Sequence, residues 1–539
     1  MTDETNGAGA VSRFDVVIVG AGFSGLYMLH KLRRSGFSVR LLEAGSGVGG
    51  TWFWNRYPGC RCDIESLEYQ YGFDDEVQRG WTWSEKYATQ PEIRAYMEYV
   101  ADKLDLNRDI QLETRVTSAV YDEDARQWAV TTDGGETFTG RFCVMATGSL
   151  SATRIPEFPG LESFQGRTFH TGDWPSEGVD FTGRRVAVIG TGSSGIQLIP
   201  IAAQQAEHLT VFQRTPNFTF PAGNRPIAKE EMDKVRSNFT ELRHFAHRSR
   251  AGSFKEAGTK PLADYDRAEA LALLEGSWNC QGPRLLSCFT DTMVNPETNE
   301  FVAEFVRGKI REIVRNPEVS RKLTPVGYPI GAKRAALDTH YYDTFNRPNT
   351  TLVDVREEPI ERITPGGILA AGKAYELDDI VFATGFDAMT GALSRIDIRG
   401  RDGITLAERW KAGPKTYLGL QVAGFPNLFM MAGAGTPSVL AVVILVSEQN
   451  VQWISQCLEA MRVKGVTEIE ALPDAEEAWG QHVSDMAQAT LFVRADSWYL
   501  GANVPGKPRV FMPYIGGLNN YSDACEKAAA DGYSGFALT

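Results

Sequence analysis

Two separate stretches of the chain repeat one pattern of hydrophobic and polar positions. In residues 14–44 and 184–216, a continuous apolar run is followed by a glycine-rich turn, a helical segment and a second apolar run. The first runs, Val16–Val19 and Val186–Ile189, lack the alternation of a half-exposed strand and are typical of a parallel strand buried on both faces. The pattern therefore predicts two strand–turn–helix–strand units.

Each of the two turns carries the sequence G-x-G-x-x-G. The glycines are Gly20, Gly22 and Gly25 in the first unit and Gly190, Gly192 and Gly195 in the second. The first glycine permits a tight turn, the second lets the backbone approach a pyrophosphate, and the third lets the helix pack closely on the strand. The following helix offers free N–H groups to phosphates. With their flanking strands, these turns predict two dinucleotide-binding sites.

The two units differ in charge where their second strand ends. Glu43 and Arg214 each lie about 20 residues past the last glycine of their turn, where a dinucleotide-binding fold contacts the adenosine ribose. A carboxylate suits a free ribose diol, whereas a guanidinium grips a 2′-phosphate. Glu43 therefore favours FAD in the first unit, and Arg214 favours NADPH in the second. A solvated surface charge is the other interpretation of Arg214.

Further strands and a helical stretch complete the predicted organisation. Arg141–Leu150 and Asp379–Ala388 each read as a buried strand followed by Ala-Thr-Gly, which would return the chain to a sheet. Between them, apolar positions recur at helical spacing, with Asn295 as N-cap and Pro296 in the first turn. We expect an α/β fold with two Rossmann-like dinucleotide-binding domains and a helical insertion. The expected segments are 1–148 and 385–539 for the FAD domain, 149–223 and 329–384 for the NADP domain, and 224–328 for the insertion.

Composition narrows the class of protein. The 539 residues are too many for one ordinary core, and 43% hydrophobic with 23% charged residues is typical of a soluble globular protein. A net charge of −13 disfavours a nucleic-acid surface, which needs a basic face. Residues 1–13 contain no apolar h-region, so we expect no signal peptide. The longest aliphatic run, Leu440–Val446, is too short to span a bilayer.

The cysteines and histidines predict neither disulfides nor a metal site. The seven cysteines are scattered and odd in number, which fits a reducing cytoplasm. Cys60 and Cys62 form C-x-C without further ligands nearby, and His244 and His247 lack a companion cluster. We interpret all four as ordinary thiols and surface histidines.

One short stretch carries a more specific signal. Residues 164–175 read FQGRTFHTGDWP, which sets Phe164, Gly166, His170, Trp174 and Pro175 in the pattern F-x-G-x-x-x-H-x-x-x-W-P. This resembles the fingerprint of Baeyer–Villiger monooxygenases, including its place before the second glycine turn. In that family the histidine and tryptophan belong to a linker that couples domain movement to cofactor binding. The redox C-x-x-C of the related disulfide reductases is absent.

The resemblance extends from about residue 14 to the C-terminus. It includes GVGGTWFWNRYPGCRCDIES, GYPIGAKR, SWYLGANVPGKPRVF and GGLNNYSDACEKAAADGYSGF. These stretches are similar to the type I, single-chain enzymes. Among these, the sequence is most similar in character to the phenylacetone, steroid and cyclohexanone monooxygenases. The chain is identified as a member of that family on these motifs.

The resemblance implies a reaction and two cofactors. NADPH would reduce FAD, the reduced flavin would bind O2 as a C4a-peroxyflavin, and the peroxide would attack a ketone to give an ester or lactone. The flavin supplies this chemistry, while the protein keeps the peroxide deprotonated and water out. A fixed cation beside the flavin serves the first purpose, because it stabilises both the peroxide and the oxyanion of the adduct.

Specific residues match the family's site. Arg334 matches the active-site arginine, whose charge persists when it is buried, and Asp63 matches the carboxylate that positions it. Lys333 matches a second 2′-phosphate contact, and Trp498 matches a residue near the nicotinamide. The catalytic residues implied are Arg334 and Asp63, and the cofactor-binding residues implied are Gly20, Gly22, Gly25, Glu43, Thr51, Trp52, Asp63, Gly190, Gly192, Ser193, Gly195, Arg214, Thr215, Lys333, Arg334 and Trp498.

The family's substrate loop maps onto Gly433–Val446. Within it, the candidate substrate contacts are Val439, Leu440 and Val443. Family members often have Asn and then Met after this loop, whereas this chain has Val442 and Val443. The uniformly aliphatic stretch favours an apolar site for a bulky, cyclic or aryl ketone. Burial in an ordinary core explains these side chains about equally well.

Other function classes stay open at this point. A flavin-dependent N- or S-oxygenase would share both cofactors, although Trp174, Pro175 and Arg334 favour the Baeyer–Villiger reaction. A non-catalytic redox-sensing dinucleotide-binding protein would not need Arg334, and an electron-transferring reductase would need a charged docking face that the sequence does not suggest. The expected partners are a ketone, as a small-molecule substrate, and O2. The protein could be a monomer or a homodimer.

Overall fold

The first glycine turn lies at the end of β1, an interior strand of an eight-stranded mixed sheet. The computed structural model describes residues 11–280 and 282–539, so most of the segment predicted to lack an apolar leader lies outside the described residues. The strand order is β17-β4-β5-β6-β1-β2-β3, with β18 also paired to β6. The strands are β1 (Val11–Val19), β2 (Val39–Leu42), β3 (Ile110–Gln111), β4 (Val116–Asp122), β5 (Gln127–Thr132), β6 (Thr137–Met145), β17 (Asp397–Arg399) and β18 (Leu428–Met430).

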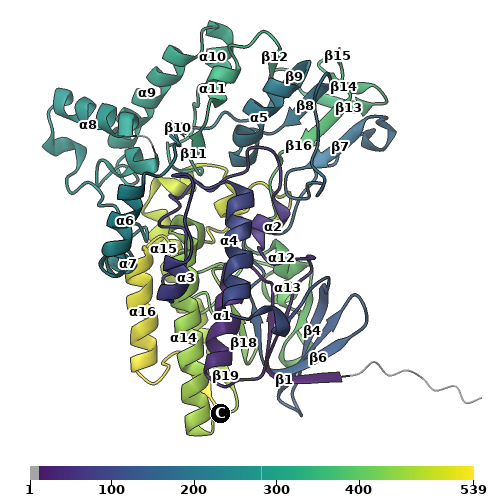
Figure 1. Cartoon of the computed structure of the whole chain (residues 1–539), viewed down its shortest axis with the longest axis vertical. Helices are drawn as coiled ribbons and strands as arrows, with labels where there is room; N and C mark the ends of the chain where they lie inside the picture. Colours follow the sequence, from purple (N-terminus) through teal and green to yellow (C-terminus); the bar gives the residue numbers. More distant parts are fainter. Residues whose placement is uncertain (1–10, 281) are drawn as a thin grey trace, which may run out of the picture.

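Burial of β1 explains its unbroken apolar run. Val16, Val17 and Ile18 are fully buried, and β1 pairs in parallel with β2 on one side and β6 on the other. Helices cover this domain, and α1 lies beside α14 in Figure 1. Because β17 and β18 join this sheet, the chain returns to the first domain after the second. The helices are α1 (Phe23–Arg34), α2 (Thr51–Trp54), α3 (Asp75–Arg79), α4 (Gln90–Lys103), α14 (Val443–Lys464), α15 (Pro473–Gln488) and α16 (Leu518–Ala530).

A five-stranded, wholly parallel sheet organises the second domain, which occupies the upper right of Figure 1. Its order is β12-β9-β8-β16-β7. Helix α5 (Ser193–Gln205) follows β8 and continues through Pro200. The strands are β7 (Arg167–His170), β8 (Arg185–Ile189), β9 (His208–Gln213), β12 (Thr350–Asp354) and β16 (Asp379–Phe382), with a small antiparallel sheet of β13 (Ile360–Thr364), β14 (Gly367–Ala370) and β15 (Lys373–Glu376).

Residues 224–328 are helical and contain no strand among those described. They lie at the upper left of Figure 1, from α6 beside the first domain to α10 beside the second. The Asn295 side chain accepts a hydrogen bond from the backbone of Glu297, which confirms the predicted N-cap of α9. The helices are α6 (Lys229–Ser237), α7 (Phe239–Arg248), α8 (Arg267–Cys280), α9 (Pro296–Ile313) and α10 (Pro317–Leu323).

These elements confirm the predicted α/β fold class with two Rossmann-like domains and a helical segment. The two domains contact each other where Tyr57 donates to the side chain of Gln197 on α5, at 2.8 Å. Gln197 in turn donates to the backbone oxygen of Arg61, at 3.0 Å. The first domain's loop 57–61 is therefore held against the helix that follows the second glycine turn.

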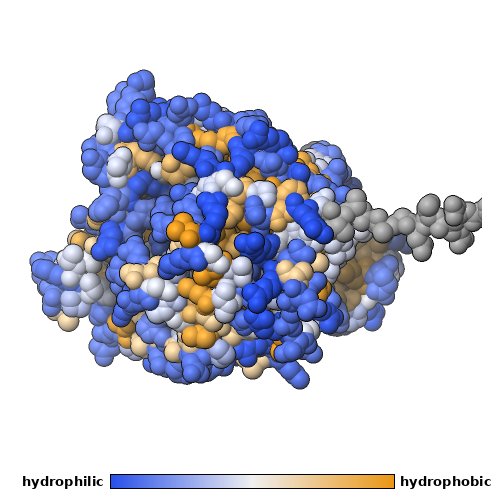
Figure 2. All heavy atoms as spheres, turned by 90° about the horizontal axis from the view of Figure 1, so that it is seen from below, coloured by the Kyte–Doolittle hydropathy of each residue, from blue (hydrophilic) through white to orange (hydrophobic). Residues whose placement is uncertain are grey.

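Most of the aliphatic run Leu440–Val446 lies in the interior. It crosses the start of α14, and Ile444, Leu445 and Val446 are fully buried. Across the described part of the chain, no helix is both long and apolar enough to traverse a bilayer. On the face shown in Figure 2, hydrophobic side chains lie in small groups among hydrophilic ones. Packing within the protein thus explains the buried part of the run.

Candidate functional site

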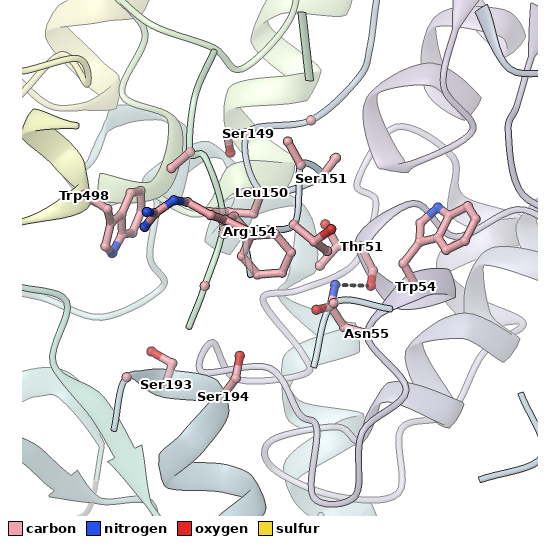
Figure 3. Close-up of a pocket in the computed structure, with 18 of the residues that line it drawn as sticks. Thr51, Trp54, Asn55, Ser149, Leu150, Ser151, Arg154, Ser193, Ser194 and Trp498 are labelled. Atoms are coloured by element: carbon pink, nitrogen blue, oxygen red, sulfur yellow. Dashed lines mark hydrogen bonds between the residues drawn. The ribbon is translucent and has the colours of Figure 1, made fainter. Parts of the chain in front are cut away.

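A cavity of about 1230 Å³ lies between the two sheets and is lined by both glycine turns. Sites for a single small ligand commonly measure about 300–1000 Å³, so this cavity has room for more than one. Figure 3 shows Ser193 and Ser194, at the start of α5, on one side of it and Thr51 and Asn55 on another. The carboxyl ends of parallel strands are where such folds bind their ligands.

The first turn forms a cradle that only glycine allows. A Cβ on Gly25 would lie 1.8 Å from the carbonyl oxygen of Gly20, so a side chain there would drive α1 away from β1. No side chain caps the N-terminus of α1, and its first turn carries no acid. Its N–H groups are therefore available to a phosphate.

Glu43 lines the cavity beside the first glycine turn. It is buried and accepts hydrogen bonds from the backbone N–H groups of Ala21 and Gly45, both at 2.7 Å. Burial raises the pKa of Glu43, although these N–H groups favour its charged form. Its carboxylate is thus fixed at the end of β2, beside the turn, where a ribose diol would find an acceptor.

The second turn repeats the cradle. Gly190 has φ of +112°, and a Cβ there would lie 2.4 Å from the carbonyl oxygen of Ala383. A Cβ on Gly195 would meet the Gly190 oxygen at 2.2 Å, whereas one on Gly192 would have no neighbour within 4 Å. The backbone at Gly192 is therefore open for a ligand to approach, and α5 begins there without a side-chain cap.

Arg214 and Lys333 bring two cations together beside the second turn. Arg214 follows β9 directly and is exposed, while Lys333 is half-buried with its Nζ 4.9 Å from the Tyr328 ring centre. Burial and then the nearby charge of Arg214 lower the pKa of Lys333, against an opposing effect of Asp496. Two cations at close range suit a doubly charged anion such as a 2′-phosphate.

Arg334 is held by acceptors from two remote segments. Its Nε and Nη2 donate to the two carboxylate oxygens of Asp63 at 2.7 and 2.8 Å, and its Nη1 donates to the backbone oxygen of Val439 at 2.7 Å. Both charged side chains remain partly exposed to the cavity. The bidentate pair fixes the plane of the guanidinium as well as its position.

The pair remains ionised. Burial alone would raise the pKa of Asp63, but the charge and hydrogen bonds of Arg334 outweigh it and leave that pKa below its usual range. Burial opposes the charge of Arg334 too, yet Asp63 raises its pKa further above the ordinary value. The cavity therefore contains a fixed cation that does not titrate at any physiological pH.

Most of the sequence-predicted site residues line this one cavity. They are Gly20, Gly22, Glu43, Thr51, Trp52, Asp63, Gly190, Gly192, Ser193, Arg214, Thr215, Lys333, Arg334, Val439, Val443 and Trp498. Gly25 and Gly195 lie behind it, where they allow each helix to approach its strand. Leu440 does not line it and instead packs with Phe492 and Leu500 on a cluster around Tyr499.

The fingerprint residues support the wall of the second domain. His170 is buried, its Nδ1 accepts from the backbone N–H of Gly172 at 3.0 Å, and burial lowers its pKa. Trp174 is buried against Phe169 and Phe181. These contacts hold the segment after β7 against its own domain, where it leads to the second glycine turn.

The cysteines are unpaired, and the two of the C-x-C sequence are buried. All seven cysteines are free. Burial raises the pKa of Cys60 to about 12 and also raises that of Cys62, so both are protonated thiols. Among the described residues, no group of three or more His, Cys, Asp or Glu side chains could hold a metal ion.

Sequence reasoning missed three residues of the site. Tyr499 lies beside Arg334, whose charge acts on the Tyr499 hydroxyl. Asn55 donates to the backbone oxygen of Thr51 at 2.9 Å, as drawn in Figure 3. Arg154 also lines the cavity. The segments around Tyr499 and Asn55 were matched as motifs, so their neighbours Trp498 and Thr51 could have pointed to them.

Comparison with known proteins identifies the family. The sequence model of one protein family, the pyridine nucleotide-disulphide oxidoreductases, matches residues 14–249. Acetone monooxygenase (methyl acetate-forming) of Gordonia sp. (strain TY-5) is 44% identical over 98% of this chain and 100% of its own length. A Baeyer–Villiger monooxygenase of Pseudooceanicola batsensis is 42% identical over 99% and 97%, and phenazine N-monooxygenase of Lysobacter antibioticus is 41% identical over 98% and 97%.

Solved structures agree over the same span. Oxidised steroid monooxygenase bound to NADP has a TM-score of 0.94 at 48% identity, over 98% of this chain and 99% of that one. OTEMO in complex with FAD and NADP has a TM-score of 0.94 at 42% identity, over the same shares. The chain belongs to the Baeyer–Villiger monooxygenases and is an FAD- and NADPH-dependent enzyme of that family.

Proposed function

We propose that this enzyme inserts one oxygen atom of O2 into a bulky, cyclic or aryl ketone, giving an ester or lactone, with Arg334 as the residue that stabilises the reacting oxyanion. The observation that carries this proposal is the guanidinium of Arg334, which three hydrogen bonds fix at the cavity wall. When bound, FAD supplies the redox chemistry by accepting hydride from NADPH and activating O2.

Arg334 suits charge that develops during oxygen insertion. A donor that is already oriented stabilises a new oxyanion without reorganising at that moment. Asp63 occupies two of the five N–H groups of the guanidinium and Val439 a third, which leaves others for the reacting atoms. We assign Asp63 and the Val439 carbonyl as positioning groups and Arg334 as the group that meets the substrate oxygen.

The two cradles accommodate the two cofactors separately. The first turn with Glu43 offers N–H groups for a pyrophosphate and a carboxylate for a ribose diol, so we assign FAD there. The second turn with Arg214 and Lys333 offers two cations instead, so we assign the 2′-phosphate of NADPH there. Thr51, Trp52, Ser193, Thr215 and Trp498 complete the proposed cofactor contacts.

The apolar lining supports a ketone with little polarity beyond its carbonyl. Val439, Ala441 and Val443 line the cavity, and Leu150 and Trp498 pack together beside them. Relatives named for steroid and cyclohexanone oxidation support a bulky or cyclic substrate.

The seven free cysteines also support a reducing compartment, so we propose a cytoplasmic enzyme.

Product analysis tests the proposed function. Enzyme, NADPH and O2 would be incubated with linear, cyclic, aryl and steroid ketones, and the products analysed by gas chromatography. We expect esters or lactones, formed fastest from the cyclic or aryl ketones. Oxidation of amines and sulfides without any ester would contradict the proposal. It would favour N- or S-oxygenation, the second candidate, which the similarity to phenazine N-monooxygenase supports.

Exchanging Val443 for methionine should alter the choice of ketone. Val443 lines the cavity at the first residue of α14, where a longer side chain would fill part of the substrate space. We expect kcat/KM for bulky against small ketones to shift by about 1 kcal/mol, or roughly fivefold. Val463→Met on the exposed end of α14 is the control. An unchanged profile in a stable Val443→Met enzyme would make Val443 ordinary core.

The affinity for NADPH should fall as the pH rises. Lys333 has a lowered pKa, so its cationic form is lost at lower pH than that of an ordinary lysine. The KM for NADPH should therefore increase toward alkaline pH while the KM for NADH, which lacks the phosphate, changes less. Lys333→Arg should flatten the NADPH profile, because arginine stays charged. Parallel pH profiles for both cofactors would contradict this role for Lys333.

A further inference from the structure

Arg154 is a cation of the cavity wall without a role in the proposed function. It lies between β6 and β7, is half-buried, and extends toward Trp498 in Figure 3. Its Nη1 donates to the backbone oxygen of Asn503 at 2.7 Å. Its other N–H groups have no acceptor within residues 11–280 and 282–539. Most of its hydrogen-bonding capacity therefore remains available to a ligand in the cavity.

Two acids in this part of the fold, Asp387 and Asp496, already have other partners. Asp387 pairs with Lys507 at 2.5 Å, and Asp496 pairs with Arg509 at 2.7 Å. In the described part of the chain no carboxylate lies within ion-pair distance of Arg154 itself. A half-buried guanidinium cannot lose its charge, and removing it from water costs free energy unless an anion compensates. Among the described residues, Arg154 therefore has no carboxylate that compensates its charge directly.

Arg154 and Arg334 lie on one continuous wall. Trp498 and Val439 pack on the same cluster around Tyr499, and Tyr499 lies beside Arg334. Trp498 also packs with Leu150 on a second cluster around Met389. Apolar side chains thus lie beside both arginines, Val439 at Arg334 and Trp498 at Arg154. A ligand with an apolar body and two polar ends would match this wall.

The cofactors leave Arg154 free in our assignment. The 2′-phosphate of NADPH has Arg214 and Lys333, and its pyrophosphate has the uncapped start of α5. Arg395 also lines the cavity, but it is exposed and donates to the backbone oxygen of Thr153 at 2.6 Å. Its charge is more strongly screened by water than that of Arg154.

We propose that Arg154 binds the carboxylate of a keto acid, so that the preferred ketones carry a carboxylate remote from the carbonyl group. Arg334 would meet the carbonyl end, Arg154 the carboxylate end, and Leu150, Val439 and Trp498 the apolar body. The carboxylate makes and breaks no bond in the reaction. This inference rests on the proposed function and narrows its substrate class.

The test compares a keto acid with its neutral methyl ester. Steady-state kinetics at saturating NADPH would be measured for oxocyclohexanecarboxylate and its methyl ester in wild type, Arg154→Gln, Arg154→Lys and Arg79→Gln. Arg79 pairs with Asp75 on the surface and serves as the charge-matched control. We expect the ratio of kcat/KM for acid to ester to fall roughly tenfold in Arg154→Gln. It should fall less in Arg154→Lys and stay unchanged in Arg79→Gln.

Two further readouts separate this role from a structural one. High salt should reduce the preference of the wild type for the acid, because the contact is ionic. Arg154→Lys keeps the charge, so part of the preference for the acid over the ester should remain measurable even if Arg154→Gln folds poorly. A wild type without preference for the acid, equal losses on both ketones, or a raised KM for NADPH in Arg154→Gln would overturn the inference. Failure of the wild type on every ketone would instead reject the proposed function.

Discussion

Arg334→Ala should abolish ester formation while NADPH is still consumed. Removing one oriented electrostatic contact commonly costs about 2.7–4 kcal/mol, a factor of roughly 10²–10³ in rate. Arg334 is fixed toward the cavity by Asp63 and Val439, so its loss removes the group assigned to the oxyanion. Oxygen should then leave as hydrogen peroxide. Stopped-flow absorbance, with ester and peroxide quantified in the same samples, measures the effect.

The conservative variant separates charge from geometry. Arg334→Lys keeps a positive charge but cannot reproduce the bidentate contact with both oxygens of Asp63. We expect it to restore only part of the ester yield. Arg79→Gln, on the surface, is the control for the loss of one charge. A near wild-type ester yield in Arg334→Ala would reject Arg334 and favour the alternative oxygenase reaction.

Arg214→Ala should weaken the binding of NADPH and leave the binding of NADH nearly unchanged. A charge-assisted hydrogen bond is worth about 1.5–3 kcal/mol, or roughly 10- to 150-fold in binding. Because Arg214 is exposed, we expect the lower half of that range. The KM for NADPH should rise, the KM for NADH should stay nearly constant, and the NADPH effect should shrink at high salt.

The double variant tests whether the two cations act on one anion. Arg214 lowers the pKa of Lys333 in the free protein, so removing Arg214 should raise that pKa and move the alkaline loss of NADPH affinity to higher pH. Steady-state kinetics of Arg214→Ala, Lys333→Ala and the pair would show non-additive losses for a shared phosphate. Equal weakening toward NADPH and NADH would contradict the phosphate assignment.

Local pattern was sufficient to predict both nucleotide units. The strand, turn and helix of each unit lie within about 30 residues, so Glu43 and Arg214 could be located from spacing alone. Arg334 and Asp63 are 271 residues apart, and no local pattern links them. Their pairing could be predicted only from the resemblance to a family.

The features that sequence missed have a physical reason. The third acceptor for Arg334 is the main chain of Val439, and every residue carries a carbonyl, so residue type gives no signal. Val439 and Leu440 are adjacent in the 3-10 turn Ser438–Leu440, where neighbouring side chains point in different directions. That explains why Val439 lines the cavity and Leu440 does not.

The Val439 carbonyl has a consequence for how this enzyme could diversify. Because the main chain makes the contact, the side chain at this position can be exchanged without removing the acceptor from Arg334. Inserting or deleting a residue is different, since consecutive Cα atoms lie about 3.8 Å apart and a shift of that size breaks a hydrogen bond. New substrate preferences should therefore arise here through substitution, while the length of the loop stays constant.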